Sequence, residues 1–242
     1  MNIQDESLRY PGNPKTNTKP AYKILVEFTS GLTVHGRLYL SRILACCGII
    51  APPFIISIII ISGLLTPGYN HLTDTISSLS QQGAASPGLM ITGFIIYGIL
   101  VIGFSCALFL RLRHGIKAYL ALSSLTLYGI CMILAGVFRN ISGVSYAGLN
   151  AAGIAHNAAV ITSCFSMLVG MWMFAGSVFK KPSWLGFTWF TITASFLGMV
   201  LSVIFLIQSY VPLAGLFQRV FYCIILIWIE VVSIWLYRLA SK

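Results

Sequence analysis

Long apolar stretches alternate with short polar segments along most of the chain. An α-helix needs about 20 residues to cross a hydrocarbon core of ~30 Å, and six stretches reach that length. They are roughly Ile43–Leu65, Gly88–Leu110, Ile116–Phe138, Gly153–Phe179, Trp184–Ile207 and Phe217–Leu239. Runs such as Ile55–Ile61 are nearly all apolar and lack the alternation of barrel strands. The pattern therefore predicts an all-α membrane protein, a bundle of six transmembrane helices.

The distribution of charge supports this class and predicts an orientation. Only 8% of the residues are charged, against about 25% in soluble domains. Of the 15 Lys and Arg residues, all but Arg139 and Arg219 fall on one side of the predicted spans. The positive-inside rule then places both termini in the cytoplasm. We assign the net charge of +10 to membrane edges facing anionic lipids, and expect a plasma or inner membrane protein without nucleic-acid partners.

Two regions are predicted along the chain. Residues 1–42 form a cytoplasmic arm, in which Tyr10–Pro20 has a disordered composition. Residues 43–240 form the six-helix transmembrane domain. The six cysteines all fall in predicted spans and are interpreted as packing residues. Because no standard catalytic or metal-binding motif is present, we expect no metal and no cofactor.

The connection after the first span has its own periodicity. Leu72, Ile76 and Leu79 follow i, i+4, i+7 spacing, with Asp74 and Ser77 on the opposite face. The spacing predicts a short amphipathic helix at the outer interface, with Thr73 or Asp74 as its N-cap.

Several polar residues are predicted to gather at the outer end of the bundle. Arg139 ends the third span, His156 lies in the first turns of the fourth among small residues, and Arg219 lies at the start of the sixth. Simpler interpretations are that the arginines reach to headgroups, that Asp74 only caps a helix and that His156 only packs. Glu230 lies near the middle of the sixth span, where an acid is costly and usually faces protein, water or a partner.

Three segments resemble a known family. They are Pro67–Gly88 (PGYNHLTDTISSLSQQGAASPG), Gly153–Asn157 (GIAHN) and Gly215–Arg219 (GLFQR). The chain resembles the domain of unknown function 998 family over about residues 43–240, with matching positions at Asp74, Ser77, His156 and Arg219. The resemblance implies a prokaryotic multi-pass membrane protein and a fold, but no reaction. Members often carry an acidic residue where this chain has Gln218, which puts a local acid–arginine pair in question.

Three functions fit these residues. In the favoured one, Arg139, Arg219 and His156, with Asp74 and Ser77, form an outward-facing pocket that binds or moves a lipid headgroup or small amphiphile.

The second is an intramembrane hydrolase. It has Ser77 or Ser78 as nucleophile, His156 as base, Asp74 as orienting acid and Arg219 as anion stabiliser. The third is a structural or assembly subunit without a small-molecule site. Membrane lipids are the expected partners, and the sequence names neither a substrate nor an oligomeric state.

Overall fold

Six long helices make up nearly all of the structure. The computed structural model describes residues 34–112, 115–139, 150–179, 184–207 and 213–239. Within these ranges there is no strand, and the elements are α2 (Val34–Leu65), the 3-10 helix η1 (Ile76–Ser80), α3 (Pro87–Arg111), α4 (Ile116–Val137), α5 (Ala151–Val178), α6 (Leu185–Ile207) and α7 (Ala214–Leu239). Each of the six α-helices is long and apolar enough to cross a membrane. The prediction of an all-α, six-helix multi-pass membrane protein is confirmed.

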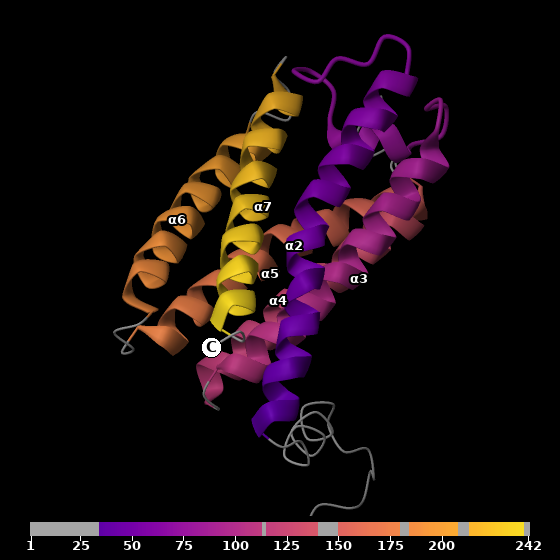
Figure 1. The fold of residues 1–242 in the computed structure, drawn as a ribbon. Helices are drawn as coiled ribbons and strands as arrows, with labels where there is room; N and C mark the ends of the chain where they lie inside the picture. The colour runs from indigo at the N-terminus through magenta and orange to yellow at the C-terminus, as the bar shows by residue number, and fades with distance from the viewer. Residues whose placement is uncertain (1–33, 113–114, 140–149, 180–183, 208–212, 240–242) are drawn as a thin grey trace, which may run out of the picture.

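The helices form a closed ring in chain order. Each α-helix packs against the next, and α7 packs against α2 as well as α6, so the first and last helices of the ring lie side by side (Figure 1). The short helix η1 contacts α2, α3 and α7 at one end of the bundle, which we call the η1 end. This arrangement brings the connection after α2 next to the beginning of α7.

The boundaries predicted from hydropathy agree closely with the observed ones, except at the start of α2. This helix begins at Val34 rather than Ile43, because its first turns continue into the polar residues that precede the apolar stretch. Residues 1–33 lie outside the described residues, and with them most of the predicted arm, including Tyr10–Pro20. The division into an arm and a transmembrane domain stays a prediction, as does the orientation.

The predicted amphipathic helix in the α2–α3 connection is not confirmed. Only the five residues of η1 are helical. Ile76 and Leu79 are buried as expected, but Leu72 precedes the helix and is 51% exposed. The N-cap is Thr75, and its side chain makes no capping hydrogen bond. The chain before Thr75 is held in turns by contacts with α7, described below, and these long-range contacts override the helical periodicity.

An aromatic cluster fills the centre of the ring. The fully buried Trp228 of α7 packs edge-on against Phe104 of α3 and Phe174 of α5, with ring centroids 5.8 and 5.7 Å apart. Its indole Nε1 donates to the hydroxyl of Thr191 on α6 at 2.9 Å, so no buried N–H is left unpaired there. This cluster joins α7 to α3, α5 and α6, and it thereby fixes the rotation of α7 about its own axis.

Candidate functional site

Arg219 fastens the α2–α3 connection to α7. Its Nη1 donates to three backbone carbonyls, those of His71 at 2.5 Å, Asp74 at 2.8 Å and Gly215 at 2.9 Å. Its Nη2 donates to the hydroxyl of Tyr69. The guanidinium therefore organises the backbone at the η1 end rather than reaching out to solvent as a free cation.

Two further hydrogen bonds join the same segments. The amide of Leu216 donates to the carbonyl of Leu72 at 2.9 Å. The amide of Ile76, at the start of η1, donates to the Oε1 atom of Gln218 at 2.6 Å. Gln218 thus satisfies the amide of the first residue of η1, which has no acceptor within the helix. Gln218, the residue before Arg219, accepts a hydrogen bond from η1 instead of pairing with the arginine.

Asp74 closes a turn instead of capping a helix. Its carboxylate accepts from the amide of Asn70 at 2.9 Å and from the hydroxyl of Thr73 at 3.1 Å. Within the described residues it forms no ion pair with Arg219, whose contact with Asp74 is to the backbone carbonyl. The charge of Arg219 is consequently met by neutral acceptors only.

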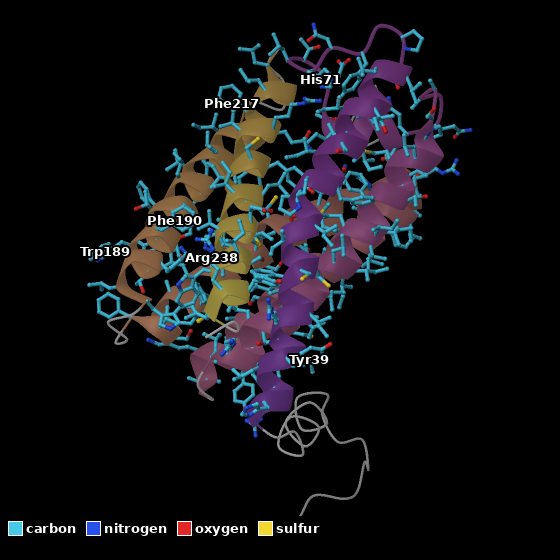
Figure 2. All side chains as sticks on the ribbon, in the orientation of Figure 1. Tyr39, His71, Trp189, Phe190, Phe217 and Arg238 are labelled. Carbon is cyan, nitrogen blue, oxygen red and sulfur yellow. The ribbon has the colours of Figure 1, made fainter. Side chains whose placement is uncertain are left out.

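An open groove of about 320 Å³ lies between α2 and α7 below these contacts. Figure 2 shows His71 at the same end of the bundle as Phe217, near the start of α7. The walls of the groove are mostly apolar, and its two basic side chains are His71 and Arg219. The lining residues are Ile56, Ile59, Ile60, His71, Ile76, Arg219, Tyr222, Cys223 and Leu226.

Arg219 gives the groove a positive charge. The Nε atom of Arg219 is buried and has no hydrogen-bond partner, and such an unmet donor on a charged group is costly. Burial, followed by the nearby positive charge of Arg219, lowers the pKa of His71 from its ordinary value. Burial also raises the pKa of Tyr69, although Arg219 opposes that effect. The phenol therefore stays protonated and able to donate to the carbonyl of Thr75, 3.0 Å away.

A smaller cavity of about 60 Å³ lies inside the ring beneath η1. Its polar lining consists of Ser77, Tyr128, Ser163, Cys164, Gln218 and Tyr222. Ile76 and Tyr222 line both this cavity and the groove. These two side chains are thus the partition between the interior of the ring and the α2/α7 seam.

His156 is buried away from this groove. It is 1% exposed, and its Nδ1 lies 2.9 Å from the carbonyl of Ala135 and 2.8 Å from that of Phe138. Because carbonyls only accept, Nδ1 carries the proton, and His156 caps the end of α4. Its Nε2 has no partner. His156 is not among the residues that line the groove or the cavity.

The remaining predicted residues lie apart from one another. Arg139 follows the end of α4, is exposed and does not line the groove that contains Arg219. The hydroxyl of Ser78 donates to the carbonyl of Thr75 at 2.7 Å. In the described part of the chain no hydrogen bond joins Ser77 or Ser78 to His156. The structure therefore brings Asp74 and Arg219 together, but not Arg139, Arg219 and His156.

Sequence reasoning did not predict the roles of three residues of this site. Tyr69 and Gln218 supply hydrogen-bond partners across the α2/α7 seam. Gly215 lets the backbone of the connection approach, because a Cβ there would lie 2.4 Å from the Asp74 carbonyl oxygen. The only signal in the sequence was the spacing of Gly215, Gln218 and Arg219 on one helix end, which does not name the distant partner.

Comparison with known proteins gives a family and nothing finer. The family model described as "Protein of unknown function (DUF998)" matches residues 49–235, which confirms the resemblance noted from the sequence. No curated protein and no solved structure matches the chain.

Proposed function

The chain belongs to the DUF998 family, and from this premise we propose that its α2/α7 groove binds an anionic amphiphile with a single hydrocarbon chain. The headgroup sits beside Arg219 and His71, and the hydrocarbon chain lies along Ile60 and Leu226. We further propose that the protein resides in the plasma or inner membrane of a prokaryotic cell, with both termini in the cytoplasm and the η1 end outside.

The positive charge of Arg219 on the wall of a mostly apolar groove carries this proposal. Its Nη2 donates one hydrogen bond to the Tyr69 hydroxyl and carries a second hydrogen that can donate to a carboxylate or phosphate group. The Nη1 atom of Arg219 donates to backbone carbonyls, while Nε has no acceptor. Because no carboxylate pairs with Arg219 among the described residues, its positive charge remains available to an anionic headgroup. The apolar walls supply the complementary surface for a hydrocarbon chain.

Native mass spectrometry of the purified protein tests the groove. The probes are lysophosphatidylglycerol, which is anionic, and lysophosphatidylcholine with the same chain, which is zwitterionic. We expect preferential retention of the anionic probe. Ile60→Trp places a large side chain in the groove and should reduce retention severalfold. Ile99→Trp, at an exposed position on α3 outside the groove, is the matched control. Equal retention by both variants would favour a structural subunit without a small-molecule site.

A pair of substitutions at Arg219 isolates the charge. Arg219→Lys and Arg219→Gln both lose the fork of hydrogen bonds to the connection, but only the lysine keeps the positive charge. We expect the preference for the anionic probe to persist in Arg219→Lys and to disappear in Arg219→Gln. If both variants keep the same preference, the headgroup does not bind through this charge.

A further inference from the structure

Two adjacent prolines remove two backbone donors from the middle of α2. Pro52 and Pro53 lie inside this helix and have no N–H group to donate. The carbonyls four residues earlier, those of Gly48 and Ile49, therefore receive no helical hydrogen bond from them. In the hydrocarbon region such a carbonyl needs another partner, because water is absent.

A buried hydroxyl of α7 lies directly against this part of α2. Ser233 is fully buried, and its Oγ has no hydrogen-bond partner. A Cβ at Gly48 would lie 2.0 Å from this oxygen. Glycine at position 48 thus allows the hydroxyl to touch the α2 backbone at the turn whose carbonyls the prolines release.

Glu230 lies one turn from Ser233 on the same side of α7. It follows Leu226, which lines the groove along the α2/α7 seam, by four residues, so both project toward the same side. Its Oε2 is buried and has no partner. Of the described residues, only Asp74 and Glu230 are acidic, and no basic side chain among them forms an ion pair with Glu230. An acid at this depth normally marks a functional site.

We propose that Glu230, Ser233 and the carbonyls of Gly48 and Ile49 bind a monovalent metal cation, with Na⁺ as the representative ion. All four supply oxygen atoms, which hard cations prefer. Carbonyls freed at breaks in membrane helices, together with acidic or hydroxyl side chains, are suited to this role. A single carboxylate neutralises a single positive charge, whereas a divalent ion would leave a net charge in a region of low dielectric constant. The site is independent of the amphiphile groove, although it lies on the same seam.

Equilibrium binding of radioactive sodium to the full-length protein in lipid nanodiscs tests this site. Choline chloride holds the ionic strength constant, and the pH is kept at about 8 so that an accessible carboxyl is ionised. We expect saturable binding of one ion per chain. Glu230→Gln should weaken the affinity about tenfold or more, a loss of about 1.4 kcal/mol. Asp74→Asn, at the other described acid, is the matched control and should bind as the wild type does.

A second variant examines the freed carbonyls without touching the acid. Pro53→Ala returns an N–H that can donate to the carbonyl of Ile49. We expect severalfold weaker sodium binding although Glu230 is intact. A thermal melt of each variant verifies folding, and Ser233→Ala replaces Glu230→Gln if that variant does not fold.

Several outcomes would overturn the assignment. One is the absence of saturable sodium binding by the wild type between about pH 6 and pH 9, which would leave Glu230 without a role as a cation ligand. Another is wild-type affinity in both Glu230→Gln and Ser233→Ala. Displacement of sodium by Ca²⁺ at concentrations below those at which Na⁺ itself competes would exclude a monovalent site.

Discussion

Arg219 donates from Nη1 to the backbone carbonyl of Asp74 at 2.8 Å, although 145 positions separate the two residues. The bond runs from the last helix of the ring to the connection after the first. Together with the contacts to His71 and Tyr69, it makes the mouth of the groove a fixed structure rather than a free loop. Predictions about this end of the bundle therefore concern α7 and the connection jointly.

Gly215→Ala should loosen the contact between α7 and the connection. The added Cβ would lie 2.4 Å from the carbonyl oxygen of Asp74 and 2.9 Å from that of His71, so the backbone must move. We expect a loss of about 1–3 kcal/mol of stability as the hydrogen bonds of Arg219 are disturbed, seen as a lower melting temperature in detergent and faster proteolysis at residues 66–75. The control is Gly186→Ala, whose Cβ would meet no atom within 4 Å; equal melting temperatures for the two variants would contradict the argument.

Two substitutions of Gln218 distinguish the effect of its side-chain volume from that of its hydrogen-bond acceptor. Gln218→Leu removes the oxygen that accepts from the Ile76 amide at 2.6 Å and leaves a buried N–H unpaired, at a cost of about 1–3 kcal/mol. Gln218→Glu keeps an acceptor and should stay within about 1 kcal/mol of the wild type. Hydrogen exchange of the η1 amides measures the difference. Similar exchange in the two variants would show that this bond does not hold η1.

Binding of the anionic amphiphile should strengthen in mild acid. Partial burial, followed by the charge of Arg219, lowers the pKa of His71 below its ordinary value of about 6.5, so the imidazole of the free protein is neutral at neutral pH. A bound anion favours the imidazolium and raises this pKa, and the affinity must therefore rise as the pH falls below about 6.5. We expect a gain of about three- to tenfold, levelling off once the free protein is also protonated.

The matched variant for this prediction is His71→Ala, which should bind with little dependence on pH over the same range. The measurement is the dissociation constant of lysophosphatidylglycerol at a series of pH values. An unchanged slope in His71→Ala would assign the pH dependence to another group. The same lowered pKa means that, as the pH is lowered, the unfolded chain takes up the proton before the folded protein does. The free energy of unfolding should therefore decrease slightly as the pH is lowered through this window.

Labelling of introduced cysteines tests the predicted orientation. In a variant without the native cysteines, Thr73→Cys lies in the exposed part of the connection, and Tyr39→Cys lies near the start of α2, where the tyrosine is 70% exposed. Figure 2 shows Tyr39 at the opposite end of the bundle from His71. A membrane-impermeant maleimide added to intact cells should label only Thr73→Cys. Labelling of Tyr39→Cys alone would reverse the topology.

Hydropathy was sufficient to predict the spans because a bilayer demands about 20 apolar residues and internal pairing of every backbone amide. These demands act locally, so five helices begin and end within a few residues of their predicted limits. The start of α2 was missed because a helix can continue beyond its apolar stretch. The ring order and the α2/α7 seam are products of packing and have no local signal.

Arg139 and Arg219 show how far the candidate site could be predicted from sequence. Arg139 and Arg219 look alike in sequence, as cations at the ends of apolar spans. In the structure Arg139 is exposed, whereas Arg219 binds the carbonyls of His71 and Asp74. What distinguishes them is the partner backbone, which a single chain's local pattern does not encode. The helix predicted in the α2–α3 connection was longer than η1 for the same reason, because Gln218 and Arg219 hold this connection in turns.

The order of synthesis gives the Arg219 contacts a further meaning. The connection after α2 leaves the ribosome and reaches the membrane well before α7 exists, so during that interval nothing on α7 can hold it. Only insertion of the last helix delivers the guanidinium and the Leu216 amide that bind it. A chain truncated before α7 would present this stretch unbound, a state that a quality-control protease can distinguish from the finished protein.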